Sequence, residues 1–284
     1  MSNTPAIDLA GRTVLRLEGG DRQRYLNGQV SNDVSKLDGG KAIAACVTTL
    51  KGKLDAVVFI TEHEGAYLID SERELREPLL ARLDKYIIAD DCELGDVSDD
   101  WHLVHVLGEW QSAAGITRRC QRFGTPGTDL WIPVGEPVPD GLELLSADEA
   151  EALRIAKAVP KWGVELTPDT LPAEAGLDAN AIDFHKGCYI GQEVISRIKS
   201  VGRVNRKLVQ LQAAAEAQLE EKVGKPLFDG DLEVGTITSA TPTLALAYVR
   251  REHNEVGTIL SLEPGEDGKK NLSTRLEIVD SQPA

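Results

Sequence analysis

The sequence has few cysteines and no long hydrophobic run. Its 284 residues include 4 cysteines, too few and too scattered to predict a disulfide framework. No apolar stretch approaches the roughly 20 residues that a membrane-spanning helix requires. The first residues show no basic segment followed by an apolar one, so we expect no secretory signal. Together these absences predict a soluble, cytoplasmic protein without a membrane partner.

Positive charge is also scarce. Lys and Arg total 31 against 46 Asp and Glu, so the formal net charge is −15 at pH 7. Non-specific binding to nucleic acid requires a broad basic surface, and we therefore expect no direct nucleic-acid partner. The composition is 42% hydrophobic and 27% charged, as in an ordinary globular protein. The length allows one large domain or two smaller ones.

The familiar motifs of metal and nucleotide sites are missing. The sequence contains no Cys-x-x-Cys, His-x-x-x-His or His-Glu-x-x-His spacing, no Walker A loop and no dinucleotide fingerprint. His102 and His105 are three positions apart on a predicted strand, which places them on opposite faces of a sheet. We therefore predict structural roles for both histidines.

Short strands and helices alternate along the first part of the chain. Two strands are joined by Lys51-Gly52-Lys53, a connection typical of a β-hairpin. Apolar residues at every fourth position from Leu75 to Ile87 predict an amphipathic helix, in which Pro78 marks a start or a bend. The strands predicted here are residues 13–18, 42–50, 54–61, 66–70, 101–107 and 129–134.

A helix and a long loop follow in the chain, and the pattern then changes in the last third. Ser146 and Glu149 form a capping box that predicts a helix to about Val159, and residues 161–183 are predicted to form an extended loop. From residue 207 onward, short alternating strands are separated by Gly, Pro and Asp, which suits a small antiparallel barrel or sandwich. We therefore expect a domain boundary near residue 206.

Residues 186–193 (Lys-Gly-Cys-Tyr-Ile-Gly-Gln-Glu) combine several features of a reactive site. Backbone amides of the glycine turn and the Lys186 ammonium would favour the thiolate of Cys188, which is the reactive and metal-binding form. If Gly191 ends the loop and Gln192 starts a helix, the positive helix end would lower the thiol pKa further or hold an anion. The alternative, a tight turn around an inert buried cysteine, remains equally open on these residues alone.

Local positive charge accompanies this segment. Residues 185–207 contain six basic residues and one acid, Glu193, a net charge of +5 in a strongly acidic protein. Such a stretch attracts an anionic ligand, although it could also pair with acidic surface elsewhere. The six basic residues are Lys186, Arg197, Lys199, Arg203, Arg206 and Lys207.

The same segment resembles the signature of the YgfZ family, folate-binding proteins related to the T-protein of the glycine cleavage system. Seven of the eight positions in residues 186–193 match that signature. The similarity extends over nearly the whole chain. It includes Gly20-Asp21-Arg22, residues 25–30, Asn32-Asp33-Val34, Gly235-Thr236 and Ser239-Ala240.

The resemblance implies an α+β fold with a folate-binding, T-protein-like region of two related subdomains (residues 1–206) and a C-terminal antiparallel β-barrel (residues 207–284). It implies tetrahydrofolate as the ligand and iron–sulfur proteins, including enzymes that thiolate tRNA, as partners. Cys188 would be the functional residue and the metal ligand, and Lys186 would act beside it. The positions implied to bind the cofactor are Gly187, Tyr189, Gly191, Gln192, Glu193, Arg197 and Arg206.

Two positions depart from the family pattern. T-protein relatives carry a second Asp on the hairpin for aminomethyl transfer, whereas here Asp55 is followed by Ala56. A carboxylate that binds the pterin ring is expected after an Arg-hydrophobic pair, but Arg154-Ile155 is followed by Ala156. The loss of one buried acceptor costs on the order of 1–3 kcal/mol. We therefore expect weakened, rearranged or lost folate binding and no aminomethyl transfer.

The sequence thus predicts a folate-binding accessory protein for iron–sulfur cluster assembly or repair, which acts through Cys188 and supports tRNA modification indirectly. Typical clusters need about four protein ligands, so one cysteine would hold a cluster only transiently and together with a partner. Two alternatives stay open. One is a tetrahydrofolate-dependent aminomethyl- or methyltransferase, and the other is a non-catalytic pterin-binding or docking module with a structural Cys188.

Overall fold

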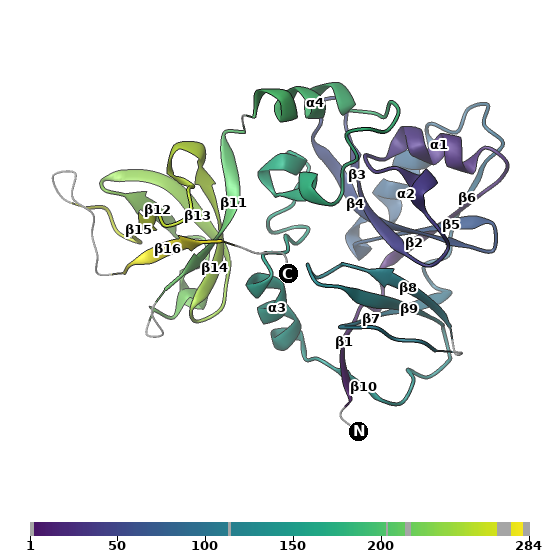
Figure 1. Ribbon diagram of the computed structural model, residues 1–284, viewed down its shortest axis with the longest axis horizontal. Coiled ribbons are helices and arrows are strands. Elements are labelled where there is room, and N and C mark those ends of the chain that lie inside the picture. The colour runs from purple at the N-terminus through teal and green to yellow at the C-terminus, as the bar shows by residue number, and fades with distance from the viewer. Residues whose placement is uncertain (1–2, 113–114, 203, 214–216, 266–273, 281–284) are drawn as a thin grey trace. The chain divides into compact units, whose positions relative to one another are not determined.

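The computed structural model describes residues 3–112, 115–202, 204–213, 217–265 and 274–280 (Figure 1). The chain divides into two compact units. The first comprises Met1–Ser146 and Leu177–Arg197, and the second comprises Ala147–Gly176 and Ile198–Ala284. The boundary expected at residue 206 stays a prediction. The strands that follow it lie in the second unit, together with residues 147–176.

Two five-stranded sheets form the framework of the first unit. One sheet is antiparallel throughout, and the other contains a parallel pair of strands at one edge. In spatial order the first sheet contains β3 (Ala42–Thr48), β4 (Leu54–His63), β5 (Ala66–Ser71), β2 (Thr13–Glu18) and β6 (Glu93–Asp96). The second contains β10 (Leu142–Leu144), β1 (Thr4–Asp8), β7 (Trp101–Val106), β9 (Gly127–Pro133) and β8 (Ile116–Cys120).

Strand β4 shows why this sequence forms a sheet. Its residues alternate between buried and partly exposed over most of its length, since successive side chains of a strand point to opposite faces. The hairpin predicted at Lys51-Gly52-Lys53 is confirmed, because β3 and β4 pair in antiparallel register on either side of it. Gly52 has a φ of +72°, which a glycine adopts without strain.

Two helices accompany the first sheet, α1 (Arg22–Gln29) and α2 (Arg76–Asp84), and Figure 1 shows them next to each other. The Tyr25 hydroxyl of α1 donates a hydrogen bond to the Leu83 carbonyl of α2. Helix α2 is shorter than the predicted segment and begins two residues before Pro78. Proline is tolerated there, because the first-turn amides have no partner within the helix.

A buried ionic cluster joins the two sheets of the first unit. Arg122 donates to both carboxylate oxygens of Asp70 on β5, at 2.9 Å each, and of Asp129 on β9, at 2.6 and 3.2 Å. The His105 ring lies 2.7 Å from Asp129, and Arg12 lies 2.5 Å from Asp70. Burial disfavours the Asp129 carboxylate, but the Arg122 charge and these hydrogen bonds outweigh burial and hold the pKa of Asp129 well below its usual range.

The two histidines of β7 lie in different surroundings, and their predicted structural roles stay predictions. His105 is fully buried and contacts Asp129, whereas His102 pairs with Asp8 at 2.8 Å near the surface. Their different surroundings follow from the alternation of side chains along a strand.

The second unit contains a six-stranded antiparallel sheet. A bridge between Phe228 and Ser261 connects its two edges through a pair of backbone hydrogen bonds of 2.9 and 3.0 Å. The sheet is therefore nearly closed, and the predicted C-terminal barrel is confirmed. In spatial order its strands are β12 (Pro226–Asp229), β13 (Leu232–Ala240), β14 (Leu244–Arg250), β11 (Arg206–Gln212), β16 (Leu276–Val279) and β15 (Ile259–Leu260).

Two further helices complete the α+β fold, α3 (Ala147–Ala156) and α4 (Gln192–Val201). Helix α3 ends earlier than predicted, and Ala158 beyond it has a φ of +50°, a conformation that ends a helix. Within the part of the chain that the structure describes, short helical turns occur at η1 (Val34–Lys36), η2 (Arg73–Leu75), η3 (Pro172–Glu174), η4 (Leu177–Ala179), η6 (Leu219–Lys222) and η7 (Arg251–His253). Among the described residues, no helix combines the length and apolar character needed to cross a membrane.

Candidate functional site

The loop that carries Cys188 is held between the hairpin of β3 and β4 and the end of α1. The Ile190 carbonyl accepts a 2.6 Å hydrogen bond from Thr48 Oγ1, and its amide donates to Gly28 O at 3.2 Å. Gly191 has a φ of +88°, and a Cβ at this position would lie 2.5 Å from the Thr49 carbonyl oxygen. A larger residue would therefore push the loop away from the hairpin. Helix α4 begins immediately afterwards, at Gln192, as predicted.

Lys186 anchors the other end of this loop. Its ammonium donates to the carbonyl oxygens of Asn27, Val30 and Asn32 at 2.8, 2.7 and 2.7 Å. Burial lowers the pKa of Lys186 to about 8, so the group still carries its proton at neutral pH. An ammonium has three N–H bonds, and all of them point to backbone acceptors. The side chain therefore orders the loop, and its part in the chemistry of Cys188 stays a prediction.

Cys188 is exposed, whereas Cys46 and Cys120 are buried and Cys92 is half-buried. Burial raises the pKa of the Cys46 thiol to about 12 and that of Cys120 well above its ordinary value. Both are therefore held as neutral thiols inside the protein. The alternative in which Cys188 is buried does not hold.

The Cys188 side chain lines a pocket of about 390 Å³, which we call the Cys188 pocket. Helix α1 supplies most of the other lining residues, including the amides Gln23 and Asn27. It also supplies Arg24, which is 69% exposed and pairs with Asp21 at 3.2 Å and Asp90 at 2.8 Å. A thiol, two amides and a guanidinium thus surround one opening. The complete lining is Gly20, Gln23, Arg24, Asn27, Gly28 and Cys188.

Sequence reasoning did not assign the α1 residues to the site. Asn27 was noted only as part of a segment similar to the family. Its contact with the loop arises across more than 150 positions of the chain, since Lys186 donates to its carbonyl. Such contacts do not follow from local sequence patterns.

The other residues predicted around the loop lie in different surroundings. Tyr189 is buried with Ile182 and Ile195, and its ring lies 5.3 Å from the Lys186 ammonium. Burial raises the pKa of the Tyr189 hydroxyl. Gly187 is exposed beside Cys188, and exposed Glu193 and Arg197 lie on α4 with Gln192. Their predicted roles in cofactor binding stay predictions.

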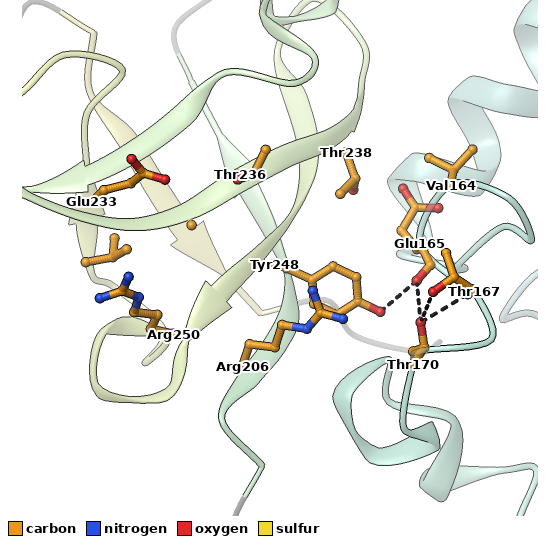
Figure 2. A pocket seen from close by; sticks show the side chains of 12 residues that line it. Val164, Glu165, Thr167, Thr170, Arg206, Glu233, Thr236, Thr238, Tyr248 and Arg250 are labelled. Atoms are coloured by element: carbon orange, nitrogen blue, oxygen red, sulfur yellow. Dashed lines mark hydrogen bonds between the residues drawn. The ribbon is translucent and has the colours of Figure 1, made fainter. Parts of the chain in front are cut away.

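Arg206 belongs to the second unit, where it lines a different pocket of about 370 Å³ (Figure 2). Its guanidinium lies over the Tyr248 ring, 4.3 Å from the ring centre, and pairs with Glu174 at 3.2 Å. Arg206 and Cys188 therefore line different pockets, each within its own unit, and the predicted role of Arg206 in cofactor binding stays a prediction. Arg203, also counted in the basic stretch, lies outside the described residues.

Neither position that departs from the family pattern supplies a carboxylate. Ala56 is fully buried on β4, and its neighbour Asp55 pairs with Arg82 at 3.0 Å. Ala156 is exposed at the end of α3, and its carbonyl accepts a 3.1 Å hydrogen bond from Gln210. The acceptor expected for a pterin ring is absent at this position. Within the described ranges, no group of three or more His, Cys, Asp or Glu side chains could hold a metal ion.

Comparisons with known proteins show what the chain is similar to. No family model matches it. A tRNA-modifying protein YgfZ of Aliivibrio fischeri (strain MJ11) is 29% identical over 289 residues, covering 90% of this chain and 88% of that protein. A mitochondrial iron–sulfur cluster assembly factor IBA57 homolog of Mycosarcoma maydis is 28% identical over 227 residues, covering 70% of this chain and 55% of that protein.

A solved structure shares the fold. The crystal structure of glycine cleavage system aminomethyltransferase T from Bartonella henselae matches with a TM-score of 0.82 at 17% identity, covering 98% of this chain and 86% of that one. These findings confirm the resemblance to the YgfZ proteins and the T-protein-like α+β fold that the sequence predicted.

Proposed function

We propose that this protein is an accessory factor for the assembly or repair of iron–sulfur clusters and that it acts through the Cys188 thiol. The observation that carries the proposal is the exposure of this one cysteine at a polar pocket, on a loop held by Lys186, while Cys46 and Cys120 are buried. The names of the YgfZ and IBA57 relatives support the same class of function. Support for tRNA modification would be indirect, through iron–sulfur enzymes that thiolate tRNA.

The cluster is cargo in this proposal. A cysteine thiolate binds iron directly, but a typical cluster needs about four such ligands. The described residues provide no further cluster of metal-binding side chains. We therefore propose that the iron–sulfur client protein supplies the remaining ligands. The protein would work in the cytoplasm, without a direct contact to nucleic acid or membrane.

Replacement of Cys188 by alanine tests this proposal. In cells that lack the native gene, we expect Cys188→Ala to leave iron–sulfur enzyme activity and tRNA thiolation at the level of the gene deletion. Cys92→Ala is the matched control, because Cys92 is the other cysteine that is not fully buried, and we expect it to restore both readouts. Wild-type activity of Cys188→Ala, at equal protein level, would favour the alternative of a docking module.

We further propose that tetrahydrofolate, the ligand implied by the sequence resemblance, binds weakly, because the fold is that of a glycine cleavage aminomethyltransferase but Ala156 offers no side-chain acceptor. We derive no catalytic step through folate, and buried Ala56 supplies no carboxylate for a transferase. Calorimetric titration should give equal affinities for wild type and Cys188→Ala, and an affinity about tenfold higher for Ala156→Glu. Loss of binding in Cys188→Ala alone would contradict this arrangement, because the thiol would then belong to the folate site.

A further inference from the structure

The pocket of the second unit, which we call the barrel pocket, has chemistry that the proposed function does not use. Figure 2 shows its three sides. Strand β13 contributes a row of polar residues, strands β11 and β14 contribute two arginines and a tyrosine, and the segment before η3 contributes the rest. The charged and hydrogen-bonding lining residues include Glu165, Arg206, Glu233, Thr236, Tyr248 and Arg250.

Two arginines are neighbours on adjacent strands at one wall of this pocket. Arg206 and Arg250 are direct partners in the antiparallel register of β11 and β14. Side chains opposite each other in such a pair share one face of the sheet, with Cβ atoms about 4.5–5.5 Å apart, and like charges there are destabilising. An anion between the two guanidinium groups would remove this repulsion.

The two arginines differ in how their charge is compensated. Arg206 is held by Glu174 and by the Tyr248 ring, so its guanidinium is fixed in place while remaining 43% exposed. The Arg250 guanidinium is exposed and makes no ion pair or hydrogen bond with any described residue. One ordered and one uncompensated guanidinium thus border the same pocket. Arginine is suited to phosphate, because its planar N–H groups bind two oxygens at once.

The acidic residues of the pocket are not equivalent. The Glu165 carboxylate is already engaged, since it accepts hydrogen bonds from Arg154 at 3.2 Å and Ser239 at 2.6 Å. It therefore does not repel an anion as a free carboxylate would. Glu233 on β13 has no ion-pair partner among the described residues, and Thr236 lies on the same strand. A carboxylate and a hydroxyl are suitable partners for the hydroxyl groups of a ligand.

We propose that the barrel pocket binds a phosphate monoester that carries hydroxyl groups, such as a sugar phosphate. The phosphate lies between Arg206 and Arg250, and the sugar hydroxyls bond to Glu233 and Thr236. The pocket volume of about 370 Å³ accommodates a ligand of this size. This inference goes beyond the proposed function and uses no residue of the Cys188 loop.

Calorimetric titration of the full-length protein with ribose 5-phosphate tests the proposal. We expect saturable binding by the wild type and an affinity at least about tenfold lower for Arg250→Met, because a charge-assisted hydrogen bond is lost. Arg251→Met is the matched control, since it removes the adjacent arginine, which does not line the pocket, and should leave the affinity unchanged. Glu233→Gln should weaken binding of ribose 5-phosphate but not of inorganic phosphate.

Three outcomes would overturn the proposal. The first is no saturable binding of ribose 5-phosphate by the wild type. The second is equal weakening by Arg251→Met, which would indicate only general charge attraction. The third is binding of glutarate as tight as that of ribose 5-phosphate, which would make the pocket a carboxylate site. None of these results alters the expected phenotype of Cys188→Ala in cells, so the two proposals fail separately.

Discussion

Arg122→Met is expected to lower the free energy of unfolding by about 3–5 kcal/mol. The guanidinium is buried and binds both oxygens of Asp70 and of Asp129, which lie on different sheets. Methionine fills much of the space but leaves two buried carboxylates with fewer partners. Removing one member of a buried ionic cluster is costly, because the remaining charges stay desolvated.

Chemical denaturation of Arg122→Met and Arg119→Met measures this effect. Arg119 lies nearby in the chain, is 72% exposed, and pairs with Asp38 at 3.5 Å. An exposed ion pair contributes only about 0–1 kcal/mol, so the control variant should remain close to wild type. Similar losses in the two variants would mean that the buried cluster does not hold the sheets of the first unit together.

Lys186→Met is expected to destabilise the Cys188 loop locally and to cost about 1–3 kcal/mol of unfolding free energy. The replacement removes three N–H donors, and the Val30 carbonyl that accepts one of them is buried. A buried carbonyl without a donor has lost its hydrogen bond to water without regaining one in the protein. The loop would then open more often than the rest of the first unit.

Hydrogen exchange provides a readout at the loop itself. The Ile190 amide donates to Gly28 O, so it reports whether the loop remains closed on α1. We expect faster exchange of this amide in Lys186→Met and unchanged exchange in Lys51→Met, which replaces an exposed lysine of the neighbouring hairpin. Unchanged exchange in Lys186→Met would show that the three carbonyl contacts do not order the loop.

Much of the architecture could be predicted because its signals are local. The hairpin at Gly52 follows from two alternating segments and a glycine between them, and the start of α4 follows from Gly191. Helix ends were less predictable. Helix α3 stops at Ala156 rather than near Val159, and α2 is confined to Arg76–Asp84, because capping and packing contacts decide where a helix ends.

The sequence by itself determined the fold class, the strongly acidic charge and the segment that carries the exposed cysteine. These depend on hydrophobic periodicity, on composition and on glycines whose backbone conformation other residues would not adopt. Only the tertiary structure decided that Cys188 reaches solvent, that the Lys186 ammonium binds backbone carbonyls, and that Arg206 lines another pocket. Each of these outcomes depends on contacts between distant parts of the chain, as between Lys186 and Asn27, which are 159 positions apart. Local sequence patterns carry no information about which distant groups meet, because the packing of the folded chain determines those contacts.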